Sequence, residues 1–196
     1  MQRRKFLSVT TAAVSTAAVS TAAVSTGAAG VLGAEASPLT RDKKGFIVKS
    51  GEARSGVHTP FQGVNPNDVK ISGKDTDGQM AVFEYIGTQK VGPPLHVHYK
   101  QDEVFYVVEG EYRFQLGTEQ SILKAGDTIF LPRNIPHTWI QLTDSGKLIY
   151  MLNPAGQLEE FFVKLSSLQG PPTPADLDKL MLAHEMKNVG PPLTLG

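Results

Sequence analysis

Short apolar runs separated by turn residues follow one another from about residue 80 to residue 153. Each run is rich in Val, Ile, Phe, Tyr or Thr, and Gly, Asp or Pro divides it from the next at nearly regular intervals. Such spacing is typical of an all-β sandwich or barrel. The predicted strands are residues 80–86, 95–99, 104–109, 111–116, 120–123, 128–131, 137–142 and 147–152.

The pattern differs on either side of this region. Residues 37–79 are polar and rich in turn formers, with short predicted strands at 46–49 and 68–71. After residue 156 the apolar positions fall at helical spacing, and one face carries Leu158, Phe161, Phe162 and Leu165. A Gly-Pro-Pro break at 170–172 precedes Thr173, a predicted N-cap, and Pro174 at the first helical position. We therefore expect two helices within residues 157–187 and a loose tail at 190–192.

The first 36 residues have the features of an export signal. Arg3, Arg4 and Lys5 give a positive start, residues 6–34 carry no charge, and residues 34–36 form the small-x-small triplet Ala-Glu-Ala. The paired arginines resemble a twin-arginine signal. A transmembrane anchor is the alternative because the uncharged run is long enough to span a bilayer, but its Ala, Ser and Thr residues insert weakly. We expect export to the periplasm or the exterior, and a single domain at 37–196.

Charge and composition exclude several classes of function. The chain has 19 Lys and Arg and 19 Asp and Glu, and removal of residues 1–36 leaves 16 and 18, a net charge of −2. A domain without a basic excess gives no reason to expect nucleic acid or an anionic membrane surface as a partner. The chain has no cysteine, which excludes disulfides, thiolate metal sites and a cysteine nucleophile.

Four residues in the strand-rich region form a candidate metal site. His96 and His98 are one residue apart in a predicted strand, so both side chains lie on one face. Glu103 opens the next strand, and His137 lies in a later one. Three imidazoles and one carboxylate suit a divalent first-row metal. Isolated strand histidines are more often structural, and Asp102 is an alternative carboxylate.

The spacing around these residues resembles the two motifs of the cupin superfamily. In residues 92–110, His-x-His is followed after four residues by Glu103 and after six more by Gly110. In residues 126–139, a glycine is followed after five residues by a proline, and His137 comes five positions later. The resemblance implies a single jelly-roll β-barrel with C-terminal helices. It also implies that His96, His98, Glu103 and His137 bind one ion of Fe, Mn, Ni, Cu or Zn.

Three positions depart from the motifs without touching an implied ligand. Gly92 lies four residues before His96 instead of six, Asn134 stands in a glycine position, and Gln141 stands where the second motif ends in Asn. Asn tolerates a left-handed backbone better than most residues, so the turn at Asn134 should survive.

The resemblance is to bacterial cupins described as quercetin-dioxygenase-like, in part through residues 154–156 (Pro-Ala-Gly) and the Glu-Glu-Phe-Phe that follows at 159–162. It implies a metal-dependent dioxygenase acting on a flavonol or another aromatic enol, with Glu103 as the base. A binding module without turnover and a metal-dependent sugar isomerase or decarboxylase are the alternatives. Several aromatic residues are candidates for an aromatic pocket or for plain core: Tyr99, Phe105, Tyr106, Phe114 and Trp139.

Three further expectations follow. His58 and His184 lie outside both motifs and are predicted to be surface histidines. Ligation needs neutral imidazoles, so metal affinity should weaken below about pH 6. Small cupins commonly pair, and we expect a homodimer that covers exposed strand edges.

Overall fold

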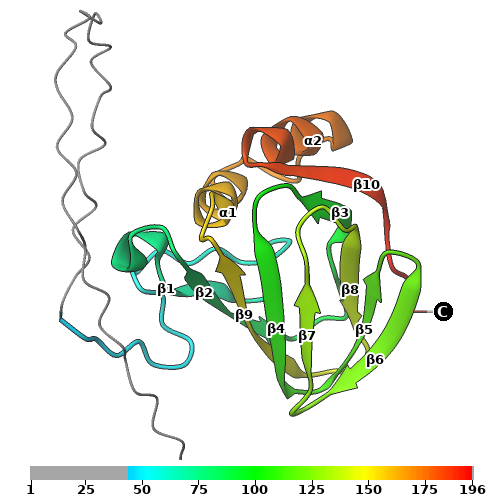
Figure 1. The fold of residues 1–196 in the computed structure, drawn as a ribbon, viewed down its shortest axis with the longest axis horizontal. Helices are drawn as coiled ribbons and strands as arrows, with labels where there is room; N and C mark the ends of the chain where they lie inside the picture. Colours follow the sequence, from blue (N-terminus) through cyan, green and yellow to red (C-terminus); the bar gives the residue numbers. More distant parts are fainter. Residues whose placement is uncertain (1–43, 196) are drawn as a thin grey trace, which may run out of the picture. The chain divides into compact units, whose positions relative to one another are not determined.

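The computed structural model describes residues 44–195, and the predicted export segment 1–36 lies outside the described residues. Within residues 44–195, ten strands form two antiparallel sheets (Figure 1). The first sheet has the order β1 (Asn67–Ile71), β2 (Ala81–Gly87), β9 (Gly146–Asn153), β4 (Asp102–Glu109) and β7 (Thr128–Leu131). The second has the order β10 (Met186–Pro192), β3 (Pro94–His98), β8 (His137–Gln141), β5 (Glu111–Leu116) and β6 (Glu119–Lys124). The predicted all-β jelly-roll barrel with C-terminal helices is confirmed.

The helices lie near one end of the barrel. A 3₁₀ helix, η1 (Gly73–Thr76), follows β1, and α1 (Leu158–Ser166) and α2 (Pro174–Ala183) lie between β9 and β10. Thr173 caps α2 as predicted, because its hydroxyl accepts a hydrogen bond from the Asp176 N–H at 3.2 Å. Among residues 44–195, no helix has both the length and the apolar character needed to cross a bilayer.

The chain changes sheets at most of its connections between β3 and β9. Side chains also alternate between the two faces of each strand. On β4, Glu103, Phe105 and Val107 are buried, whereas Tyr106 and Val108 are exposed. Residues that are close in sequence are therefore distributed over facing walls of one interior.

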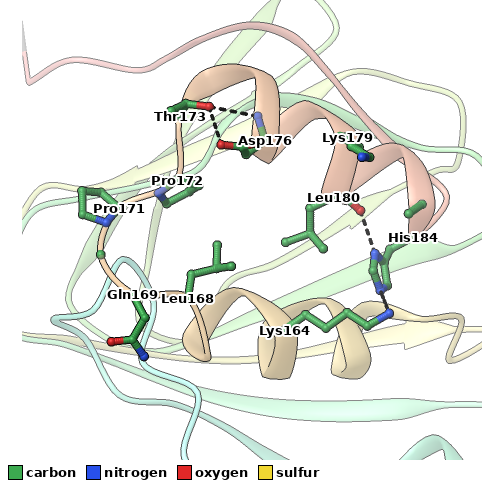
Figure 2. A pocket seen from close by; sticks show the side chains of 12 residues that line it. Lys164, Leu168, Gln169, Pro171, Pro172, Thr173, Asp176, Lys179, Leu180 and His184 are labelled. Carbon is green, nitrogen blue, oxygen red and sulfur yellow. Dashed lines mark hydrogen bonds between the residues drawn. The ribbon is translucent and has the colours of Figure 1, made fainter.

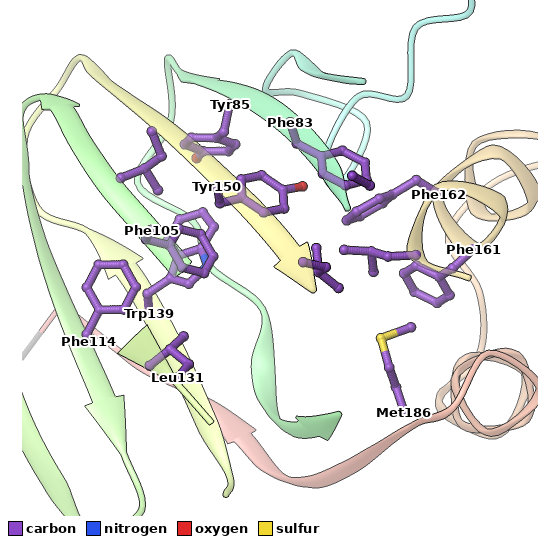
Figure 3. Packing of buried hydrophobic residues seen from close by; sticks show 14 of the residues in the cluster. Phe83, Tyr85, Phe105, Phe114, Leu131, Trp139, Tyr150, Phe161, Phe162 and Met186 are labelled. Atoms are coloured by element: carbon purple, nitrogen blue, oxygen red, sulfur yellow. The ribbon is translucent and has the colours of Figure 1, made fainter. Parts of the chain in front are cut away.

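Aromatic rings fill the space between the sheets (Figure 3). The Tyr150 ring of β9 lies between Phe83 and Phe105, with both centroid distances at 4.9 Å and the rings nearly parallel. Trp139 of β8 meets Tyr85 of β2 edge-on at 4.9 Å, which joins the two sheets. Such contacts stabilise the barrel beyond the area that they bury.

The predicted strand at 46–49 is wrong, because residues 45–49 are irregular. Lys70 on β1 donates hydrogen bonds to the Lys49 and Glu52 carbonyl groups, and the Glu84 carboxylate accepts one from the Gly51 N–H at 2.8 Å. Side chains of the sheet therefore form hydrogen bonds with the backbone of this segment, and the segment does not pair with β1 as a strand.

The predicted loose tail at 190–192 is also wrong. The second helix ends at Ala183, and Glu185 turns the chain with a left-handed φ of 66°. The next residue begins β10, which pairs with β3 from Met186 opposite His98 to Pro192 opposite Pro94. Met186 is 2% exposed, so burial of its side chain anchors the strand.

Candidate metal centre

The structure brings the four predicted ligand residues together inside the barrel. His96 and His98 come from β3, His137 from β8 and Glu103 from β4. All four side chains are buried, and one ligand atom from each lies within 4.8 Å of the others. Both sheets contribute, since β3 and β8 belong to one and β4 to the other.

Strand pairing fixes the positions of the three imidazoles. His96 lies directly opposite His137 in the β3–β8 pair, and their ring centroids are 4.6 Å apart. His98, two residues along the same face, has its ring parallel to that of His137 at 5.4 Å. The predicted shared face of His96 and His98 is therefore observed.

Backbone carbonyl groups orient two of these rings. His96 Nδ1 lies 2.9 Å from the Pro94 carbonyl oxygen, and His137 Nδ1 lies 3.0 Å from that of Ile135. A carbonyl oxygen can only accept, so Nδ1 carries the proton in both rings. Each Nε2 then presents a lone pair, which is the arrangement that a metal ligand requires.

The environment also keeps the histidines of β3 neutral. Burial lowers the pKa of His96 and of His98 to about 3, and the neighbouring His137 ring acts in the same direction. Protons therefore compete for these two nitrogens at a lower pH than an ordinary histidine pKa implies.

The donor set fits a cation. His137 Nε2 is buried and has no hydrogen-bond partner, although it lies 3.2 Å from Glu103 Oε2. Glu103 Oε2 is also 3.9 Å from His98 Nε2. A lone pair on nitrogen facing a carboxylate oxygen is unfavourable unless a positive charge lies between them. Three neutral imidazoles and one carboxylate form a mixed N/O set suited to a divalent first-row metal.

The alternative prediction that Asp102 is the carboxylate ligand is wrong. Its carboxylate pairs with Arg133 at 2.7 Å and accepts the Arg133 N–H at 2.9 Å. The Arg133 side chain lowers the pKa of Asp102 to about 2. Neighbouring residues of a strand point to opposite faces, so only Glu103 can face the histidines.

Comparison with known proteins identifies the domain. Residues 82–152 match the Cupin domain family, and this range contains all four clustered residues. Residues 82–152 of the barrel are a cupin domain.

Relatives of this cupin match over part of their length. Quercetin 2,3-dioxygenase of Bacillus subtilis is 25% identical over 157 residues, which cover 80% of this chain and 45% of that protein. An uncharacterized protein of Methanocaldococcus jannaschii is 42% identical over 43 residues, or 22% of this chain and 34% of that protein. The chain thus spans less than half the length of either relative.

Solved structures that are similar include KdgF from a Halomonas species and an RmlC-like cupin from Shewanella frigidimarina. The first is 16% identical with a TM-score of 0.49, covering 57% of this chain and 94% of that one. The second is 21% identical with a TM-score of 0.43, covering 50% and 84%.

The departures from the cupin motifs are all accommodated away from the ligand atoms. Asn134 adopts a left-handed φ of 65° as predicted, and its N–H donates to the His98 carbonyl at 2.8 Å. Gln141 is buried and donates to the Thr143 carbonyl at 2.9 Å. At Gly92, a Cβ atom would lie 1.8 Å from the Trp139 carbonyl oxygen, so this position admits only glycine.

Sequence reasoning missed a polar chain behind His98. Gln101 is 2% exposed, lies beside the His98 side chain and counteracts the fall in its pKa. The Gln101 amide donates to Glu185 at 2.7 Å, and Glu185 also binds Lys100 at 2.6 Å. A polar residue in a tight turn gives no sequence signal of such a role.

A small cavity of about 50 Å³ adjoins the ligand cluster. Its lining consists of three of the four clustered residues together with mainly apolar side chains: His96, His98, Glu103, Phe61, Asn67, Pro93, Phe105, Trp139, Tyr150, Leu158 and Phe162. Two of the predicted pocket aromatics, Phe105 and Trp139, line it.

The other three predicted pocket aromatics do not line this cavity. Tyr99 and Tyr106 are exposed, and Phe114 is buried in the core against Phe105. Tyr106 lies outward because Glu103 and Phe105 on the same strand occupy the inward positions. Phe61 and Phe162, which sequence reasoning did not place here, come from the loop before β1 and from α1.

A second cavity of about 460 Å³ lies between the end of α1 and α2 (Figure 2). His184 lines it, and the prediction of a surface position is wrong because this residue is 2% exposed. Its Nδ1 donates to the Leu180 carbonyl at 2.7 Å, and its Nε2 lies 3.4 Å from Lys164 Nζ. His58 is exposed as predicted and pairs with the buried Asp68 at 3.0 Å.

Proposed function

We propose that this cupin is a metal-dependent dioxygenase acting on an aromatic or other apolar enol. One observation carries the proposal: the cavity beside the ligand cluster is lined by aromatic and aliphatic side chains, and neither Lys nor Arg is among its lining residues. The likeness to a quercetin 2,3-dioxygenase over 80% of the chain supports it.

Four residues would hold the metal: His96, His98, Glu103 and His137. When bound, such an ion supplies Lewis-acid stabilisation of an enolate oxygen. Glu103 is the only carboxylate that lines the small cavity in the described chain, so it is the candidate base for the enol proton. The walls formed by Phe105 and Trp139 would orient a planar substrate and exclude water.

The same lining argues against the sugar isomerase or decarboxylase alternative. Anionic sugars and oxo-acids are held by basic side chains, and Glu103 would repel a second carboxylate. Because neither Lys nor Arg lines the cavity, an anionic substrate suits it less well than an uncharged enol does.

The cavity volume sets a further condition. About 50 Å³ holds one or two waters, whereas pockets for drug-sized ligands occupy about 300–1,000 Å³. A flavonol therefore requires displacement of the walls that Phe61 and α1 contribute, and a smaller enol requires less. A substrate panel should include both sizes.

Oxygen uptake tests the proposal. Protein loaded with Mn, Fe, Ni, Cu or Zn is offered flavonols, catechols and small cyclic enols in an oxygen-electrode assay, with Glu103→Gln, which removes a metal ligand, as the inactive comparison. We expect substrate-dependent oxygen consumption by the wild type and little by the variant. Metal-loaded wild type that consumes no oxygen with any substrate would favour the binding module without turnover.

Export and homodimer formation are also proposed. Export rests on the paired arginines, Arg3 and Arg4, and on the uncharged run 6–34. Mass spectrometry of the native protein should find a start near Ser37, and an intact Met1 on protein from the cytoplasm would contradict it. Light scattering at micromolar concentration tests the dimer.

A further inference from the structure

An unpaired amide lies in the wall of the metal cavity. Asn67, the first residue of β1, is 1% exposed and lines the same cavity as His96, His98 and Glu103. Its Nδ2 is buried without a hydrogen-bond partner. Leaving a buried amide N–H unpaired destabilises the empty site, so a ligand that accepts from it gains that interaction.

The orientation of this amide is fixed by Tyr150. The Tyr150 hydroxyl donates to Asn67 Oδ1 at 2.7 Å, which turns Nδ2 away from the tyrosine. Burial raises the pKa of Tyr150 well above its ordinary value, so the hydroxyl keeps the proton that it donates. The Tyr150 ring is itself held between Phe83 and Phe105.

The backbone of Asn67 is held as well. Its carbonyl accepts the Thr59 hydroxyl at 2.6 Å, and the residue lies opposite Tyr85 in the β1–β2 pair. The amide is therefore a preorganised donor: both its side-chain oxygen and its main chain are engaged, and only Nδ2 is free.

We propose that Asn67 Nδ2 donates a hydrogen bond to a second oxygen of the enol substrate, and that Tyr150 is the positioning residue that aims it. This deepens the proposed function and rests on it. Because the cavity is small, that oxygen must lie close to the enol oxygen. Because the amide is uncharged and Glu103 is near, it is a carbonyl or hydroxyl oxygen and not a carboxylate.

Anaerobic binding to the Co(II)-loaded protein tests the proposal, with absorption of the metal as the readout. Acetohydroxamate offers oxygen acceptors, whereas imidazole, once bound through one nitrogen, offers only a donor. We expect Asn67→Ala to raise the Kd of acetohydroxamate about 10-fold and to leave that of imidazole within about twofold. Tyr150→Phe should raise the Kd of acetohydroxamate by a smaller factor, since it removes the hydroxyl and keeps the ring stack.

Asn153→Ala is the matched control, because that exposed amide donates only to the Gln79 carbonyl. It should change neither Kd. An Asn67→Ala protein that binds acetohydroxamate as tightly as wild type, weakens both probes equally or loses its metal would overturn the proposal. So would wild type that binds neither probe. Binding needs no turnover, so a failed oxygen-uptake assay leaves this test intact.

Discussion

Asp102 and Glu103 are adjacent carboxylates on β4 with opposite surroundings. Asp102 pairs with Arg133 at 2.7 Å, whereas Glu103 Oε2 lies 3.2 Å from His137 Nε2 inside the barrel. The separation follows from the two-residue period of a strand, which sends neighbouring side chains to opposite faces. One carboxylate thus fastens a turn while the other completes the ligand cluster.

Removal of the negative charge should therefore have different effects at Asp102 and at Glu103. Glu103→Gln keeps the shape of the side chain but removes the anionic ligand. We expect the affinity of the protein for the metal to fall at least about 10-fold. Asp102→Asn should keep the wild-type metal content while it weakens the pairing with Arg133. Elemental analysis of both purified variants measures the difference, and equal loss in the two would refute the assignment.

His137→Ala should lose metal as well, because it removes the nitrogen of β8 from the cluster. The control is His58→Ala, whose side chain is exposed and pairs only with Asp68. We expect the control to bind metal stoichiometrically and His137→Ala to bind it at least about 10-fold more weakly, by calorimetric titration with Zn²⁺. Full occupancy of the His137→Ala protein at equal affinity would contradict the site.

The metal-free protein should lose stability in acid. Burial lowers the pKa of His96 and His98 to about 3, below the ordinary value of 6.5, so between these values the unfolded chain binds more protons. The free energy of unfolding should then fall as pH decreases from about 6.5 to about 3, by on the order of 1 kcal/mol per pH unit.

Urea unfolding of the apoprotein at pH 7, 5.5 and 4 measures this dependence. His98→Gln replaces a titrating side chain by one that does not titrate, so its stability should vary less steeply with pH than that of wild type. An unchanged slope would show that His98 is not the source of the effect.

Gly92 should tolerate no side chain. A Cβ atom there would lie 1.8 Å from the Trp139 carbonyl oxygen, a clash with backbone that only a shift of β8 could relieve. We expect Gly92→Ala to cost about 1–3 kcal/mol or more and to lower Tm by several degrees. Gly45→Ala is the control, since nothing lies within 4 Å of the added atom, and differential scanning calorimetry of both should separate them.

Three members of the ligand cluster were predictable from local information, whereas His137 was predicted from its position in the second cupin motif. His96 and His98 need only the two-residue period, and the spacing to Glu103 needs only one turn. The left-handed turn at Asn134 was likewise predictable, since Asn accepts that conformation.

What the sequence did not predict depends on tertiary partners. The stretch that forms β10 contains Gly190 and two prolines and has little strand propensity, and it becomes a strand because β3 offers an edge. The burial of His184 depends on packing against Phe161, which lies on another helix. The cavity walls from Phe61 and Phe162 meet only in the folded barrel.

The pairing of β3 has a kinetic consequence. This strand carries two of the four clustered residues, yet it meets β8 only at His96 opposite His137, and its extended partner is β10. Met186 must find His98, which lies 88 positions earlier in the sequence. Contacts of such high contact order form slowly, so β3 should be among the last strands of the barrel to complete its hydrogen-bond ladder. During synthesis, a nascent chain whose β10 segment has not yet emerged from the ribosome should therefore hold the ion only loosely.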